Sequence, residues 1–139
     1  MFHRILVPTD FSEQSKRAMD IALAISNLYN GCVTLLHVIE IIADSTFAEF
    51  ESFYTKLEDR ARKNMDDWAE AAAGSGVKIE KKIIYGNRTG EIVRFAEENQ
   101  VDLIVLNSHK IDVNEPTLGW GTISYKVSIL SSCPVMLVK

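Results

Sequence analysis

The stretch Val101-Asp-Leu-Ile-Val-Leu106 is almost wholly apolar and has the length of a strand, and the polar run Asn107-Ser-His-Lys110 follows it directly. Further on, Gly121-Thr122 opens a helical pattern that ends near Leu130, and Cys133-Pro-Val-Met-Leu-Val138 is a second apolar run. A strand that is apolar throughout is typical of the centre of a parallel sheet, because helices cover both faces there. The sequence therefore predicts two parallel strands joined by a helical crossover.

Short apolar runs alternate with helical periodicity along the rest of the chain. Ser12 can cap a helix that Asn30-Gly31 is expected to end, with Gly31 in the left-handed conformation. The apolar positions of this helix are Ala18, Ile21, Ala22, Ile25 and Leu28. A longer amphipathic helix follows and is broken by Gly74-Ser75-Gly76. Strands are expected near residues 3–7, 33–39, 77–85, 102–106 and 134–138. Five strands separated by four helices predict one α/β domain over residues 1–139, built on a doubly wound parallel sheet.

The composition is that of an ordinary globular protein, with 47% hydrophobic and 24% charged residues. The formal net charge of −4 argues against a nucleic-acid partner, because phosphate binding requires a basic face. Cys32 and Cys133 have neither metal-ligand nor CxxC spacing, so we expect free thiols and no metal site. The sequence shows no signal-peptide pattern and no apolar stretch of membrane-spanning length, so we expect a cytoplasmic protein without a membrane partner.

A glycine and a hydroxyl residue that open a helix just past a buried strand form a candidate anion site. The free N–H groups and the positive end of the helix dipole both point at the incoming group. The same arrangement also joins strands to helices in proteins that bind nothing. Ligands in doubly wound sheets lie past the carboxyl ends of the strands, where the strand order reverses. If the first and fourth strands are neighbours there, Pro8-Thr9-Asp10 and Asn107-Ser108-His109-Lys110 face one crevice, and Gly121-Thr122 closes its far side.

Several of these residues also have a purely structural interpretation. Asp10 can be a ligand-binding acid or an ordinary cap of the next helix, and His109 can be a site residue or an exposed loop histidine. His37 lies inside an expected strand, which favours a core or supporting role over ligand binding. Ser108, His109 and Asp10 contain the residue types of a hydrolytic triad, but the sequence has no GxSxG nucleophile elbow. We therefore assign no catalytic residue.

Five segments in this order resemble the universal stress protein family. They are "ILVPTDFSEQSKRAMDIALAIS" (5–26), "VTLLHVIE" (33–40), "YGNRTGEIVRFAEENQVDLIVLNSH" (85–109), "GTISYKV" (121–127) and "SSCPVMLVK" (131–139). The resemblance implies an adenine-nucleotide α-hydrolase-like fold with strand order 3-2-1-4-5, and a homodimer paired through the last strand. Many members bind ATP with little or no dedicated hydrolysis, so at most weak ATP hydrolysis is expected.

Nucleotide-binding members of that family carry a phosphate motif of Gly, two residues, Gly, nine residues, then Gly followed by Ser or Thr. Here Asn107 and Lys110 stand at the two earlier glycine positions, and ten residues separate Lys110 from Gly121-Thr122. Glycines at those positions allow close backbone approach to a phosphate. Lys110 could instead supply a positive charge to it.

Two interpretations of this altered motif remain open. In the first, the protein binds ATP or AMP, with or without Mg, as a dimeric regulator of the stress response. The expected binding residues are Pro8, Thr9, Asp10, Val38, Asn107, Ser108, His109, Lys110, Gly121, Thr122 and Ile123. In the second, nucleotide binding has been lost and the dimer acts through protein partners. A nucleotide hydrolase or transferase is a third possibility that the fold alone supports, and fold is poor evidence of chemistry.

Overall fold

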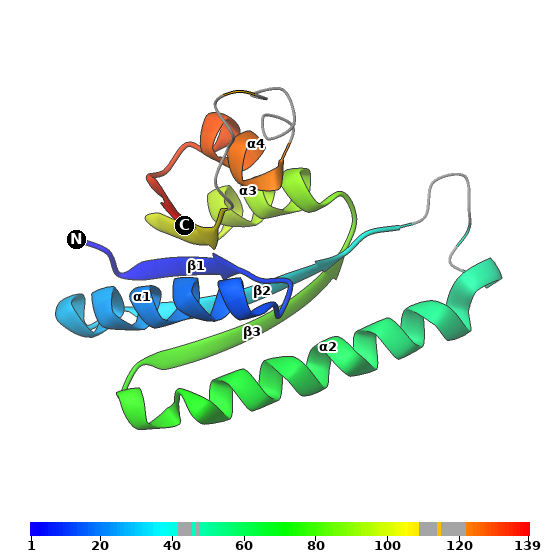
Figure 1. Ribbon diagram of the computed structural model, residues 1–139, viewed down its shortest axis with the longest axis horizontal. Coiled ribbons are helices and arrows are strands. Elements are labelled where there is room, and N and C mark those ends of the chain that lie inside the picture. Colours follow the sequence, from blue (N-terminus) through cyan, green and yellow to red (C-terminus); the bar gives the residue numbers. More distant parts are fainter. Residues whose placement is uncertain (42–45, 47, 109–113, 115–121) are drawn as a thin grey trace.

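The computed structural model describes residues 1–41, 46, 48–108, 114 and 122–139. In this part of the chain, five strands form one sheet in the order β3-β2-β1-β4-β5 (Figure 1). All four neighbouring pairs are parallel. The strands are β1 (Arg4–Pro8), β2 (Cys32–Ile39), β3 (Lys78–Tyr85), β4 (Leu103–Asn107) and β5 (Val135–Val138). The helices are α1 (Glu13–Tyr29), α2 (Glu51–Ala71), α3 (Arg88–Glu98) and α4 (Ile123–Leu130), with 3-10 turns η1 (Ala48–Phe50) and η2 (Ala73–Ser75).

The predicted doubly wound parallel sheet and its strand order are confirmed. Each strand boundary lies within one residue of its predicted position. The agreement is close because the apolar runs are short and bounded by turn-forming residues such as Gly86, although Pro8, which was expected to follow the first strand, is its last residue. The order 3-2-1-4-5 places β3 and β5 at the two edges of the sheet, and β1 is where the winding reverses.

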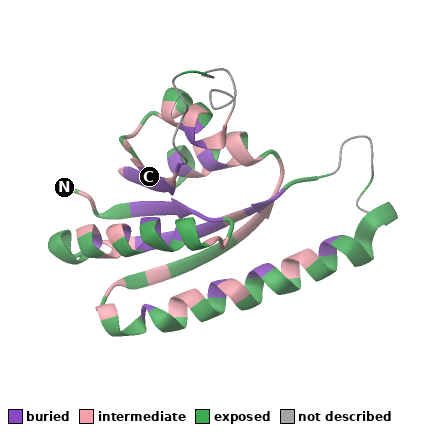
Figure 2. Ribbon diagram, viewed as in Figure 1, coloured by how far each residue is buried: buried purple, intermediate pink, exposed green. Residues whose placement is uncertain are grey.

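Two apolar layers lie on opposite faces of the sheet, because successive side chains of a strand point to opposite sides. Odd-numbered residues of the central strands, such as Val7 and Val105, pack with Met19 of α1 and Met65 of α2. Even-numbered residues, such as Leu6 and Ile104, pack with Ile92 of α3 and Val127 of α4. Burial on both faces explains why β1, β2 and β4 are almost entirely buried (Figure 2). Among the described residues, no helix is both long and apolar enough to cross a bilayer.

Helix α1 begins as predicted and ends differently. The Ser12 side chain caps it by accepting a hydrogen bond from the N–H of Ser15. At the other end Asn30, and not Gly31, takes the left-handed conformation, with φ 53°. Gly31 has another role, because a Cβ atom there would lie 2.8 Å from the carbonyl oxygens of Phe2 and His3. The prediction that Leu28 is a core position was also wrong, since it is 80% exposed at the helix end.

Candidate functional site

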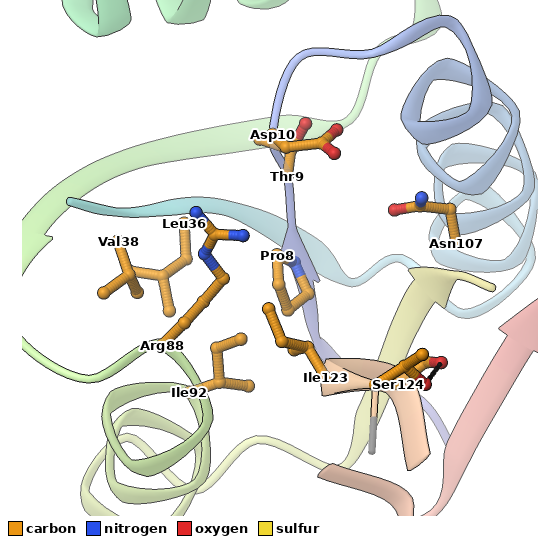
Figure 3. Close-up of a pocket in the computed structure, with 11 residues that line it drawn as sticks. Pro8, Thr9, Asp10, Leu36, Val38, Arg88, Ile92, Asn107, Ile123 and Ser124 are labelled. Carbon is orange, nitrogen blue, oxygen red and sulfur yellow. Dashed lines mark hydrogen bonds between the residues drawn. The ribbon is translucent and has the colours of Figure 1, made fainter. Parts of the chain in front are cut away.

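A cavity of about 380 Å³ lies at the carboxyl ends of β1, β2 and β4, closed on one side by the start of α3 and α4 (Figure 3). This is the position at which doubly wound sheets bind ligands, and the volume lies in the usual range of small-molecule sites. The lining residues are Pro8, Thr9, Asp10, Leu36, Val38, Arg88, Ile92, Asn107, Thr122, Ile123 and Ser124. We call this space the central cavity.

Most of the residues expected at the site come together around the central cavity. Seven of them line it: Pro8, Thr9, Asp10, Val38, Asn107, Thr122 and Ile123. Ser108 is buried next to the cavity and contacts Ser124, which lines it. His109, Lys110 and Gly121 lie outside the described residues, as do most of the residues between Lys110 and Gly121.

Asp10 is held by the first turn of α1. Its Oδ1 accepts hydrogen bonds from the Ser12 N–H at 2.9 Å and from the Ser15 hydroxyl at 2.6 Å. Partial burial raises the pKa of Asp10, but the hydrogen bonds from Ser12 and Ser15 outweigh it and hold the pKa below its ordinary value. The carboxylate is therefore ionised at neutral pH. Because Ser12 is the helix cap, Asp10 does not itself cap α1 and acts as an anchored acid at the cavity wall.

Thr9 forms a rigid part of the same wall. Its N–H donates to the carbonyl of Leu36 at 2.9 Å, and its hydroxyl oxygen accepts from the N–H of Phe11 at 2.9 Å. Its carbonyl lies 2.8 Å from Nδ1 of His37. Burial lowers the pKa of His37, more than the hydrogen bond to Thr9 raises it, so the imidazole is neutral and donates from Nδ1. In this place His37 supports the backbone of Thr9.

Hydroxyl groups gather at the opposite end of the central cavity. Thr122 precedes α4 in an extended conformation, and its side chain makes no capping bond to the helix. Its Oγ1 lies 3.1 Å from Oγ of Ser124, which lies 3.1 Å from Oγ of Ser108. Nζ of Lys139 donates to Oγ of Ser108 at 3.3 Å. The first turn of α4 therefore presents polar groups at the helix end that carries partial positive charge.

Sequence reasoning missed four residues of the cavity: Leu36, Arg88, Ile92 and Ser124. Arg88 is the first residue of α3, whose cap is the side chain of Asn87. The turn Gly86-Asn87 after an expected strand was a usable signal for a helix start at the same sheet edge. Nothing in the pattern shows that α3 then lies over β2, which brings the Arg88 side chain beside Leu36 and Val38 (Figure 3).

A second cavity of about 410 Å³ lies beside the first, between the end of β2 and the helix α2. Asp10, Val38 and Arg88 line both cavities, so Arg88 stands at the boundary between them. The other residues of the second cavity are Phe11, His37, Ile39, Glu40, Phe53, Leu57, Arg60, Ala61 and Asn64. Nε of Arg88 is 3.9 Å from a carboxylate oxygen of Glu40, a loose contact between two partly exposed side chains.

Acidic, histidine and cysteine side chains do not form a metal site in the described ranges, where no group of three or more could hold an ion. Cys32 and Cys133 are both free. The central cavity contains a single carboxylate, that of Asp10, among its described lining residues.

The strand order and the cavity at the point of reversal define a doubly wound α/β fold with a ligand position at its switch point. The solved structure of MJ0577 described below shares this fold, the adenine-nucleotide α-hydrolase-like fold. The family model described as "Universal stress protein family" matches residues 1–139, and the chain belongs to that family. Universal stress protein MJ0577 of Methanocaldococcus jannaschii is 33% identical to the chain, with 100% of this chain and 96% of that protein aligned. Universal stress protein YxiE of Bacillus subtilis is 31% identical over the full length of both.

Solved structures show the same fold. The structure of MJ0577 superposes with a TM-score of 0.85 at 33% identity, covering 100% of this chain and 96% of that one. A universal stress protein in complex with cAMP superposes with a TM-score of 0.78 at 21% identity, over 99% and 97% of the two chains. The universal stress protein of Archaeoglobus fulgidus in complex with dAMP gives 0.73 at 17% identity, over 99% and 98%. At these lower identities the likeness shows the fold alone.

Proposed function

We propose that this universal stress protein binds an adenine nucleotide, ATP or AMP, in the central cavity and acts as a dimeric regulator. The observation that carries the proposal is convergence: the carboxyl ends of β1, β2 and β4 and the start of α4 meet at one cavity. Family members of the same fold have been solved with cAMP and with dAMP, which supports an adenine nucleotide as the ligand class.

The phosphate groups would lie at the start of α4. Thr122 and Ser124 offer hydroxyl groups there, and the helix dipole favours an anion. Gly121 and Lys110, which lie outside the described residues, are expected from the sequence to add a backbone amide and a positive charge. Magnesium, if it takes part, would be held mainly by the phosphates, since Asp10 is the one carboxylate on the described cavity wall.

The adenosine would occupy the other end of the cavity. Leu36, Val38 and Ile92 offer an apolar surface for the base, and the ionised Asp10 can accept hydrogen bonds from ribose hydroxyls. The guanidinium of Arg88 lies beside this apolar surface (Figure 3), where it can stack on the face of a purine. The binding residues expected from the sequence and the four that it missed would thus share one ligand.

A protein that binds no nucleotide and acts through protein partners is the competing function. It is favoured by Asn107, which lines the central cavity and stands at the first glycine position of the phosphate motif that the family resemblance implies. The amide oxygen of Asn107 lies 3.2 Å from the hydroxyl oxygen of Ser15, whose proton is donated over the shorter 2.6 Å distance to Asp10. A ligand would have to share the cavity with Asn107.

A homodimer through β5 is part of the proposal. Strand β5 is an edge strand with the apolar sequence Val135-Met-Leu-Val138, and Met136 is 37% exposed. Pairing of this edge with a second copy would cover it symmetrically. Light scattering should give twice the 15.6 kDa of one chain, and Met136→Glu should give one chain, because like charges would meet across the two-fold axis. Leu28→Glu on α1 is the control and should leave the dimer intact.

The two free cysteines fit a cytoplasmic location.

The nucleotide proposal is tested by direct binding. Mass spectrometry of small molecules released from freshly purified protein should detect an adenine nucleotide. Isothermal titration with ATP, ADP and AMP, each with and without magnesium, should give saturable heats. Thr122→Val, which removes a hydroxyl at nearly constant volume, should weaken binding roughly tenfold, the size of one hydrogen bond to a charged group. No heat at millimolar nucleotide would reject the proposal in favour of the partner-binding dimer.

A further inference from the structure

We propose that Lys139 is a positioning residue for the phosphate end of the ligand and acts through a relay of three hydroxyl groups. The relay runs from Lys139 through Ser108 and Ser124 to Thr122, which lines the central cavity. The inference rests on the proposed nucleotide function and adds to it a residue that does not itself line the cavity.

The relay is continuous in its geometry. Nζ of Lys139 is 3.3 Å from Oγ of Ser108, and the two further steps to Ser124 and Thr122 are each 3.1 Å between hydroxyl oxygens. Ser108 and Ser124 are 7% and 5% exposed, so water competes little for these bonds. Thr122 and Ser124 both line the cavity, and Figure 3 shows the dashed contact at Ser124 beside Ile123.

The first donor gives the relay its direction. A lysine ammonium has three N–H donors and no acceptor, so the Ser108 oxygen must accept from it. If each hydroxyl then donates to the next, Ser124 accepts from Ser108 and Thr122 accepts from Ser124. The Thr122 proton is left to point into the cavity. A threonine before a helix usually accepts a bond from the first turn, but the Thr122 side chain makes no such capping bond, so its hydroxyl is available.

Lys139 is held where the relay needs it. The N–H of Ser108 donates to the carbonyl of Val138 at 2.8 Å, which continues the β4–β5 pairing by one residue. Nη1 of Arg17, on α1, donates to the carbonyl of Lys139 at 3.1 Å. The backbone carbonyls of Val138 and Lys139 are thereby fixed by Ser108, at the end of β4, and by Arg17 of α1. This keeps the Lys139 ammonium near Ser108.

Such a relay would favour ligands that carry negative charge at the Thr122 end. Hydrogen bonds in a chain polarise one another, by about 10–30% per bond, and a charged donor at the start strengthens each following donor. A phosphate oxygen would gain from the stronger Thr122 donor. In the proposed arrangement an adenosine without phosphate would not reach Thr122 and would gain nothing.

The test compares ATP with adenosine on full-length protein by isothermal titration. Lys139→Met, which keeps an unbranched side chain one atom shorter and removes its donors, should weaken ATP binding roughly threefold to tenfold, a loss of up to one hydrogen bond to a charged group. The same change should leave adenosine binding unaltered. Lys139→Arg keeps a cationic donor and should restore most of the ATP affinity. Lys126→Met is the matched control, because it removes one exposed charge from α4 outside the relay.

Ser108→Ala interrupts the relay at its first hydroxyl and should reduce the preference for ATP over adenosine as Lys139→Met does. Equal ATP affinity in wild type and Lys139→Met would overturn the relay while leaving the nucleotide function intact. Equal losses for ATP and adenosine would overturn it as well, since they indicate a general structural effect. Absence of binding by wild-type protein to either ligand would reject both the relay and the proposed function.

Discussion

The hydroxyl group of Ser15 donates a 2.6 Å hydrogen bond to Oδ1 of Asp10, five residues earlier in the chain. This bond ties the first turn of α1 to the acid at the cavity wall, and the Ser12 N–H adds a second bond to the same oxygen. Asp10 is therefore fixed before any ligand arrives. Fixed acceptors bind a ribose with less loss of side-chain entropy than mobile ones do.

The bond from Ser15 predicts that two buried serines of α1 respond differently to alanine substitution. Ser15→Ala should lower the free energy of unfolding by about 1–2 kcal/mol, because the buried hydroxyl donates to a charged carboxylate. Ser26 is also fully buried, but its hydroxyl has no partner in the described part of the chain. Ser26→Ala should be neutral or stabilising, since no bond is lost and a buried polar group is removed. Urea unfolding of both variants measures the difference, and equal destabilisation would contradict it.

His37 predicts a loss of stability in mild acid. Burial lowers its pKa in the folded protein, while the unfolded chain has a pKa of about 6.5. As the pH falls through about 6.5, the unfolded state binds a proton that the folded state does not, so the free energy of unfolding falls until the pH passes the lower folded pKa. Between pH 7 and 5 the wild type should lose more stability than His37→Asn. Parallel pH profiles for the two proteins would rule out this role of His37.

A side chain at residue 31 should destabilise the protein by steric overlap, whereas a side chain at residue 74 should not. A Cβ atom at residue 31 would lie 2.8 Å from two backbone oxygens, which cannot move without disturbing the start of β1. Gly31→Ala should therefore cost about 1–3 kcal/mol of stability, the usual range for overpacking. Gly74→Ala is the control, because a Cβ there meets nothing within 4 Å. Thermal unfolding should separate the two variants, and a stable Gly31→Ala protein would show that the N-terminal segment can shift.

The position of Arg88 predicts that its side chain contributes to the affinity for the base and not to the affinity for the phosphates. Arg88→Ala should weaken AMP and adenosine by the same factor, roughly fivefold, in line with a cation–π contact of about 1 kcal/mol. Arg94→Ala on the same helix is the control, since Arg94 is exposed and pairs with Glu91 at 2.6 Å outside the cavity. Titration calorimetry gives both factors. A loss for AMP alone would place Arg88 at the phosphate and contradict the stacking.

The central architecture could be predicted from sequence because it depends on local patterns. Buried strands such as Leu103–Asn107 are continuous apolar runs, and the cap at Ser12 is a short-range signal. Strand order does not follow from such patterns, and here it came from the family resemblance, which the structure confirmed.

Other features depend on contacts between distant segments and were missed. Arg88 reaches the cavity because α3 packs over β2, and Ser124 lines the cavity from the first turn of α4, where it contacts Ser108, 16 residues away. Gly31 was correctly marked as special but for the wrong reason, since its constraint comes from the backbone of Phe2 and His3. Asn30 takes the left-handed position instead, which asparagine tolerates better than most residues.

Thr9 uses its N–H, its carbonyl and its hydroxyl oxygen for bonds within the protein, to Leu36, His37 and Phe11. At the end of β1, these three polar groups of Thr9 are therefore already hydrogen-bonded before a ligand enters the cavity. Adjustment to different guests would fall to side chains at the margin, above all Arg88, whose contact with Glu40 is long. Ligands of different size would then be accommodated by different rotamers of the Arg88 side chain, while the backbone around the cavity stays in place.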